Sequence, residues 1–378
     1  MEIGFLKNYG GQRVERDLPF SPPSSDEGEQ ADDTAEQKPV VNFDLEVPRE
    51  KWFARNPLLP SEWRARDWAN RPIRFVDGKD VGQTVAWLRG RDYPVPVRLA
   101  EIGGVAMRVV DEELRREYAE VKRVVAMDTS PFPWDEVEDF AIALRQYEMY
   151  LLPTTQPGQE MSYDFDVLEK LTKATRRRTS YEMGLLEELA VAQDNDTPTV
   201  VDGPLKTHEG GFDTLRSPIF GVVKSQRRTY LHPQGQMMLY DLRTGRRTPA
   251  FSFQYDTSSG DEKDKGRLPV VSWYMRLAEE DDAAMPSLGI VRVEVSYKWF
   301  ESQGYLSQKG GEEIGVNGLG QEFIDQLTRT VFEYRCRERS YRRAANSLHP
   351  IVRAEASLGA MFSRGNNLKQ EFYRLTGL

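Results

Sequence analysis

The segment TVVDGPL at residues 199–205 carries a short apolar run to an Asp that is followed at once by Gly, and IRFVDGKD at 73–80 nearly repeats this pattern. Both segments are typical of a buried strand that ends at Asp-Gly. A carboxylate there is costly unless a cation or a donor meets it. The alternative for each segment alone is a turn, because Asp-Gly is a common turn signal. Two such ends on neighbouring strands favour a metal site formed by Asp77 and Asp202.

A third carboxylate precedes the second strand. Glu182 lies in the segment RRRTSYEMGLLEEL. A helix, a short loop and a strand would return Glu182 to Asp202, although Glu187 or Glu188 are alternatives and a solvated helix face is the simpler interpretation. Three carboxylates at one place stay ionised only with cations between them. Oxygen ligands favour Mg²⁺ or Mn²⁺, and a pair of such ions can generate hydroxide and hold the leaving oxygen of a phosphodiester.

The composition is that of an ordinary globular protein. The chain has 378 residues, of which 39% are hydrophobic and 29% charged, and its net charge is −9. No apolar run approaches the length of a membrane-spanning helix, and no signal peptide is visible. Cys336 is the only cysteine, which excludes an internal disulfide framework and a cysteine-based zinc site. A cytoplasmic protein that does not enter a membrane is the plain expectation.

The chain divides into three parts by composition. Residues 1–20 are expected to form a short docking element. Residues 21–45 are expected to be a disordered linker, because SPPSSDEGEQADDTAEQKP holds six acidic residues, one lysine and no aromatic residue. Residues 46–378 are expected to form the folded body.

The body is predicted to mix strands and helices. Helical composition is expected in 111–127 and 133–152, and also in 164–195, where a polar middle favours a break between two helices. Two strands are expected within 93–111, turning through Gly103-Gly104. Further strands are expected at 73–77, 199–205, 219–225, 228–232, 236–255, 268–278 and 289–300, and helices at 321–347 and 350–363.

Several of these motifs resemble the NurA nucleases. The resemblance rests on the strand that ends in Asp-Gly, the helix with R-x-x-x-E, and VDGPL followed by GVVK. Tyr341 and His349, eight residues apart, are similar to a Tyr and a His near the end of that family. The resemblance spans about residue 70 to about residue 360. It departs from the family pattern at DGKD, where Asp-Gly-Ser is more usual.

The resemblance implies an RNase H-like α/β fold, with a mixed β-sheet flanked by helices and additional C-terminal helices. It implies a metal-dependent DNA nuclease that acts on ends or single strands, as a homodimer, in DNA repair or in defence against foreign DNA. The partner that it implies is a hexameric ATPase similar to the HerA translocase. No ATP-binding loop is present in this chain, so any ATP dependence must come from that partner.

The resemblance also implies roles for individual residues. Mn²⁺ or Mg²⁺ would be held by Asp77, Glu182, Asp202 and His349, which with Tyr341 form the implied catalytic set. Lys224 would contact phosphate as a point charge. The basic segments KSQRRTY and YRCRERSYRR fall near these residues, as a groove that tracks phosphates requires. The expected DNA contacts are Lys224, Arg227, Arg228, Arg342 and Arg343.

Two other functions compete with a nuclease. The chain could be a non-catalytic DNA clamp or adaptor of a translocase, which the apparently complete set of carboxylates disfavours. It could also be a regulatory protein whose acidic N-terminal segment binds a partner or mimics DNA.

Overall fold

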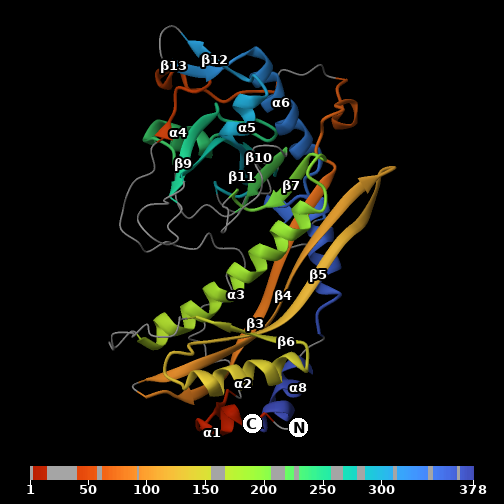
Figure 1. Ribbon diagram of the computed structural model, residues 1–378. Coiled ribbons are helices and arrows are strands. Elements are labelled where there is room, and N and C mark those ends of the chain that lie inside the picture. The colour runs from red at the N-terminus through yellow and green to blue at the C-terminus, as the bar shows by residue number, and fades with distance from the viewer. Residues whose placement is uncertain are drawn as a thin grey trace.

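The structure is a computed structural model, and its centre is one large mixed sheet (Figure 1). The strand order is β2-β9-β10-β11-β8-β7-β3-β4-β5-β6, and β1 pairs with β3. The residues that the structure describes are 3–14, 41–57, 62–91, 93–154, 167–205, 218–224, 230–256, 267–278, 286–309, 313–338, 344–363 and 367–378.

The strands of the sheet are β1 (Gln12–Arg13), β2 (Val41–Asn42), β3 (Arg74–Arg89), β4 (Pro94–Val110), β5 (Glu113–Met127), β6 (Met149–Pro153), β7 (Thr199–Asp202), β8 (Ile219–Val223), β9 (Phe251–Asp256), β10 (Arg267–Arg276) and β11 (Ile290–Ser296). A separate hairpin consists of β12 (Leu306–Lys309) and β13 (Glu313–Val316). The helices are α1 (Phe5–Asn8), α2 (Trp134–Arg145), α3 (Val167–Ala192), α4 (Pro233–Tyr240), α5 (Tyr297–Ser302), α6 (Gly318–Glu333), α7 (His349–Gly359) and α8 (Asn367–Thr376), with short 3₁₀ turns η1 (Arg49–Lys51), η2 (Ala65–Asp67) and η4 (Ala344–Asn346).

The middle of the sheet has the RNase H-like arrangement that the sequence motifs implied. Strands β3, β4 and β5 form an antiparallel meander. On the other side of β3, β7 runs parallel to β3, and β8 runs parallel to β7. Helices flank this sheet, and further helices follow at the C-terminal end of the chain. The expected fold class is therefore confirmed.

Two expectations about the meander are wrong. Residues 94–110 form one unbroken strand, and Gly103-Gly104 lie in its middle, because glycine in a strand also permits another backbone or helix to approach closely. Residues 113–127 form a strand and not a helix. Their Glu, Arg, Lys and Ala residues are good helix formers, but pairing with β4 along the whole strand decides the conformation.

The helices also differ in part from expectation. The helix expected at 133–152 ends at Arg145, and β6 follows it. The segment 164–195 contains one continuous helix, α3, and no break. Within 236–255 a helix precedes the strand β9, because Pro233 starts α4 and the His232 side chain accepts a hydrogen bond from the Gly235 N–H. No strand lies within 230–232, and the rest of the strand expected at 228–232 is outside the described residues.

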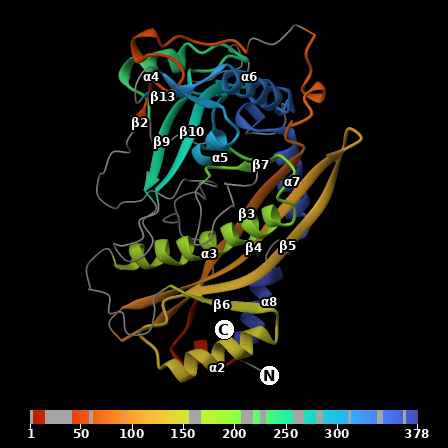
Figure 2. The same ribbon diagram turned by 45° about the horizontal axis from the view of Figure 1, so that its top comes forward.

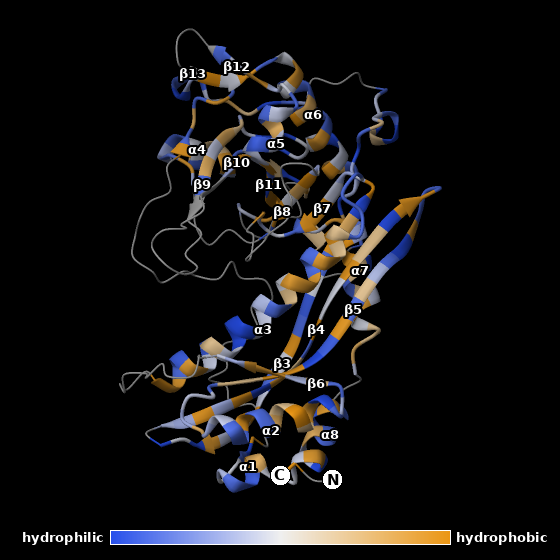
Figure 3. Ribbon diagram, viewed as in Figure 1, coloured by the Kyte–Doolittle hydropathy of each residue, from blue (hydrophilic) through white to orange (hydrophobic). Residues whose placement is uncertain are grey.

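Helices cover both faces of the meander. Figure 2 shows α3 in front of β3, β4 and β5, and α7 behind them. The hydrophobic and hydrophilic residues that alternate along α3 in Figure 3 fit a helix with one buried side. Alternate residues of the strands enter different cores: Phe75 and Val200 pack with α5 and α6, whereas Val76 and Val201 pack with α3.

The two termini lie together at the far end of the meander, beside α1, α2 and α8 (Figure 1). The N–H of Ile3 donates to the carbonyl of Leu375, and Phe5 stacks on Phe140. Residues 3–14 are thus part of the folded body, and a docking role for residues 1–20 stays a prediction. Residues 41–42 pair with β9, whereas the acidic stretch at 21–39 lies outside the described residues. No helix within the described ranges is long and apolar enough to cross a membrane.

Candidate active site

Asp77 and Asp202 occupy equivalent positions on neighbouring parallel strands. The paired residues of β3 and β7 end with Val76 opposite Val201, and the two aspartates are the next residues along each strand. Both carboxylates therefore point to the face on which Phe75 and its partner are buried, the face covered by α6 and α7. Asp77 is 4% exposed. The register supports the expectation that the two aspartates lie side by side, but only Asp202 ends a strand. The strand end expected at Asp77 is wrong, because β3 continues through Gly78 to Arg89.

Lys224 neutralises one side of the second carboxylate. Its Nζ lies 2.7 Å from Oδ2 of Asp202, and both side chains are at most one-tenth exposed. The other oxygen, Oδ1, is buried and accepts no hydrogen bond from any part of the chain that the structure describes. A buried carboxylate oxygen normally has a donor or a cation beside it. Oδ1 of Asp202 is therefore a position at which a cation or a further donor could bind.

Glu182 does not lie beside Asp202. It projects from α3, on the opposite face of the sheet, where its carboxylate is 3.2 Å from Nη1 of Arg178 and 3.6 Å from Nζ of Lys122 on β5. The expected placement of Glu182 at the end of β7 is thus wrong, because α3 is a single long helix and Glu182 sits near its middle.

Glu187 is the helix carboxylate that comes closest to the first Asp-Gly. A Cβ built on Gly78 would lie only 2.6 Å from Oε1 of Glu187. Gly104 pairs with Gly78 across β3 and β4, and a Cβ there would lie 2.6 Å from the carbonyl oxygen of Leu186. This pair of glycines lets α3 settle directly onto the sheet, and it brings Glu187 to the backbone that follows Asp77.

The two Asp-Gly pairs therefore need glycine for different reasons. Gly78 lies within a strand and makes room for α3. Gly203 has a φ of +113°, a conformation that side chains disfavour, and nothing crowds it. The repeated sequence signal thus reflects a close helix contact at Gly78 and a backbone with positive φ at Gly203.

The remaining expected residues are spread over this face or are not described. His349 is the first residue of α7 and is exposed, and its N–H donates to the carbonyl of Tyr334 at 2.7 Å. Tyr334 in turn packs edge-on against Phe75, so the start of α7 lies on the Asp77 face. The other expected residues, Tyr341, Arg227, Arg228, Arg342 and Arg343, lie outside the described residues.

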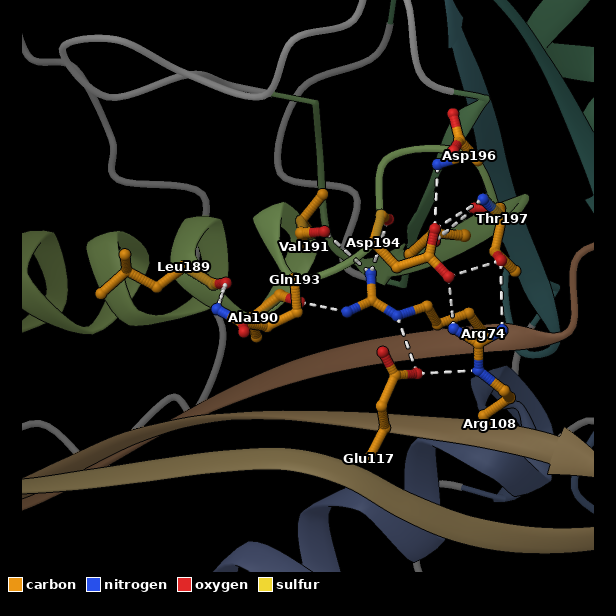
Figure 4. Close-up of polar contacts among 11 residues, drawn as sticks. Arg74, Arg108, Glu117, Leu189, Ala190, Val191, Gln193, Asp194, Asp196 and Thr197 are labelled. Carbon is orange, nitrogen blue, oxygen red and sulfur yellow. Dashed lines mark hydrogen bonds and ion pairs between the residues drawn. The ribbon is translucent and has the colours of Figure 1, made fainter.

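A buried arginine fixes the end of α3, and sequence reasoning missed it. Arg74, fully buried three residues before Asp77, donates to the carbonyls of Ala190, Val191 and Asp194 at the C-terminal end of α3 (Figure 4). Its Nε also lies 3.1 Å from Glu117. The sequence signal that could have indicated this residue is an arginine within the otherwise apolar start of the strand, IRFVDG. Arg74 ties β3 to the helix that carries Glu187.

The same network shifts the pKa of several groups. Although burial acts to raise it, hydrogen bonds from Thr197 and Arg108 hold the pKa of Asp194 well below its usual range. The pKa of Glu117 is also lowered, because Arg108 and Arg74 outweigh the effect of burial. Side-chain hydrogen bonds to these two carboxylates raise the pKa of Arg108. These shifts favour the charged forms of Asp194, Glu117 and Arg108 at neutral pH, and the ion pairs among them help to hold the end of α3 against the sheet.

The donor set fits a hard divalent cation only in part. Within the described ranges, no three His, Cys, Asp or Glu side chains gather closely enough to form a metal site by themselves. Mg²⁺, however, is often held by one or two carboxylates, with water and substrate phosphate completing its shell. Asp77 and Asp202, with the unpartnered Oδ1 of the latter, fit that kind of site.

Comparison with known proteins adds a distant structural likeness. No protein-family model matches the chain, and no curated protein matches it. Among solved structures the chain is similar to the NurA nuclease from Sulfolobus solfataricus, with 9% sequence identity, a TM-score of 0.37, and 86% of each chain covered. This is the family that the sequence motifs resemble. A likeness this distant carries no argument about chemistry.

Proposed function

We propose that the chain is a metal-dependent DNA nuclease that hydrolyses phosphodiester bonds with Mn²⁺ or Mg²⁺. The observation that carries the proposal is the pair of buried aspartates, Asp77 and Asp202, side by side on parallel strands, with one oxygen of Asp202 lacking a described donor. The motif resemblance to the NurA family supports the same function. The substrate would be DNA ends or single strands.

Asp77 and Asp202 would hold the cation on the face covered by α6 and α7. When bound, a divalent ion of this kind activates water and stabilises charge on the phosphoryl oxygens. Lys224 already lies at this position. Its ammonium would turn from Asp202 to a phosphate oxygen once a bound cation neutralises the carboxylate and DNA brings a phosphate within reach. The lysine would then stabilise negative charge that develops during hydrolysis.

The helix carboxylate in this proposal is Glu187, which would support the site from the opposite face of the sheet. It lies against Gly78, the residue that follows Asp77, whereas the carboxylate of Glu182 is paired with Arg178 and Lys122. His349 begins the helix that packs on the aspartate face, and it remains a proposed ligand or proton carrier at the edge of the site. The role of Tyr341 stays a proposal from the family resemblance.

The biological setting is proposed from the resemblance alone. The chain would act as a homodimer with a hexameric ATPase similar to the HerA translocase, in DNA repair or in defence against foreign DNA. The chain carries no ATP-binding loop, so such a partner would supply the energy for moving along DNA.

The test is cleavage of linear and single-stranded DNA in Mn²⁺, Mg²⁺ or EDTA by wild type and by Asp202→Asn. We expect wild type to cut in metal only, and the variant to bind DNA without cutting it. Equal cleavage by both proteins would remove Asp202 from the reaction and refute the proposed site.

A non-catalytic DNA clamp is the second candidate. The observation that favours it is the ion pair between Lys224 and Asp202, which already neutralises part of the carboxylate. A clamp would bind DNA equally well with and without metal, and it would cut none even with the ATPase partner and ATP present.

A further inference from the structure

Four arginines surround an open cavity at the C-terminal end of α6. The cavity has a volume of about 510 Å³ and is lined by Arg64, Arg329, Phe332, Glu333, Arg335 and Arg337. Among the described residues that line it, one carboxylate faces four guanidinium groups, so this lining is positive although the whole chain carries a net charge of −9. We call it the arginine cavity.

The single carboxylate is already engaged with the protein. Oε2 of Glu333 accepts a hydrogen bond from the N–H of Ala65 at 3.0 Å. Its Oε1 lies 3.6 Å from Nε of Arg329. Glu333 therefore compensates one arginine at most. No described carboxylate forms an ion pair with Arg337, which is exposed at the cavity mouth.

One arginine is held in a fixed orientation. The guanidinium of Arg335 stacks on the ring of Phe332, 3.8 Å from its centre. Its Nη1 donates to the carbonyl of the same residue at 2.9 Å. A planar guanidinium fixed in this way keeps its N–H donors in a defined fork. Such a fork matches the geometry of a phosphate better than a mobile ammonium group does. Capping the end of α6 explains Arg335 but not the exposed Arg337.

The cavity lies next to the aspartate face. Arg335 pairs with Leu348, and the following His349 donates its N–H to Tyr334. Tyr334 packs against Phe75, which is two residues before Asp77 on the same side of β3. A short run of directly contacting residues therefore joins the arginine cavity to the aspartate pair.

We propose that the arginine cavity binds the phosphate backbone of DNA and holds the strand on its way to Asp77 and Asp202. This inference rests on the proposed function for its ligand. Arginine contacts to phosphate position a nucleic acid without reading its sequence. The cavity thus adds Arg64, Arg329, Arg335 and Arg337 to a DNA path for which the sequence motifs named other residues.

The experiment measures binding of fluorescein-labelled single-stranded and duplex DNA by anisotropy, in EDTA, over a range of salt concentrations. The test variant is Arg64→Gln/Arg337→Gln, because both side chains are exposed and neither supports the core. The matched control is Arg145→Gln/Arg374→Gln, which removes the same charge from the exposed surfaces of α2 and α8 at the far end of the molecule (Figure 1).

We expect the test variant to bind about tenfold more weakly at low salt, and the slope of log affinity against log salt to fall by roughly 1.4 to 1.8, since each lost phosphate contact removes about 0.7 to 0.9. The control should match wild type. The variant Arg64→Lys/Arg337→Lys should recover the slope, because it restores the charges. The form of DNA, single-stranded or duplex, that shows the larger loss of affinity is the form that the cavity holds.

An affinity and slope equal to those of the control would overturn the inference, and so would a wild type that binds no DNA. An arginine cavity that serves an acidic protein partner would give the first of these results. The proposed function fails separately, through metal-dependent cleavage by Asp202→Asn. Its failure would leave a measured loss of DNA binding at the cavity unaffected.

Discussion

Nζ of Lys224 lies 2.7 Å from Oδ2 of Asp202 in a pocket where both side chains are almost completely buried, and the lysine meets only one of the two carboxylate oxygens. Burying an ion pair is stabilising only when its remaining polar atoms are also satisfied. The ion pair therefore leaves Oδ1 of Asp202 without a described partner. It suits a carboxylate that exchanges one cation for another.

Replacing Lys224 by Met should destabilise the folded chain strongly. The change leaves a buried Asp202 without its cation, a loss that typically costs about 3–5 kcal/mol. Millimolar Mn²⁺ should raise the midpoint of thermal unfolding of this variant more than that of wild type, because a bound cation stabilises the folded state. Lys298→Met, at an exposed position on α5, is the control and should behave like wild type. A variant as stable as wild type without metal would contradict the assignment.

The two helix glutamates should differ in a cleavage assay. Glu182→Gln should keep activity within about a factor of three, since surface ion pairs such as those with Arg178 and Lys122 contribute little. Glu187→Gln should lose about tenfold or more, as groups that support metal ligands commonly do. Circular dichroism should show both variants folded. The reverse order of activities would return Glu182 to the site.

The glycines that face α3 should respond differently to alanine. Gly104→Ala should lower the free energy of unfolding by about 1–3 kcal/mol, because its Cβ would meet the backbone of Leu186. Gly78→Ala should cost less, since the flexible side chain of Glu187 can turn away, but cleavage should fall. Gly318→Ala, with no atom within 4 Å of the new Cβ, should leave both properties near wild type. Equal losses of stability at the first two positions would show that α3 adjusts freely.

The charge network at the end of α3 should make stability depend on pH. Because the pKa of Asp194 is lower in the folded than in the unfolded chain, its contribution is present above the ordinary value of about 4 and is lost as pH falls toward the folded value. Urea unfolding of wild type and Asp194→Asn should therefore differ most near neutral pH and converge in acid. Thr197→Val, which removes one donor to Asp194 (Figure 4), should give a smaller difference. A difference that is constant with pH would contradict this account.

The sequence predicted the central strands better than the strands around them. The segments 73–77 and 199–202 are apolar and were recognised as strands from local signals, but the strand end expected at Asp77 is wrong because β3 continues to Arg89. The strand at 113–127 was mistaken for a helix because its charged residues have helical propensity, and only pairing with β4 overrides that preference. Gly103-Gly104 read as a turn because a sequence does not show which helix will approach a strand.

The sequence also predicted some parts of the candidate site and not others. The two matching Asp-Gly motifs predicted that Asp77 and Asp202 lie on neighbouring strands, and the register of β3 and β7 agrees. Their role as metal ligands stays a prediction. The choice among Glu182, Glu187 and Glu188 depended on the rotation and depth of α3, which the glycine pair and Arg74 determine from other elements. The arginine cavity gathers residues from η2, α6 and the segment after α6, so no single stretch of sequence indicated it.

The adjacent glycines of β4 have a mechanical consequence. Gly103 faces Leu358 of α7, and Gly104 faces Leu186 of α3, each at less than 3 Å from where a Cβ would lie. At this point β4 contributes only backbone to the layer between the two helices, and the side chain of Leu358 packs directly on it. A shift of α7, whose first residue adjoins the arginine cavity, is therefore passed directly to the helix that carries Glu187. The molecule is stiff where the two ends of the proposed DNA path are joined.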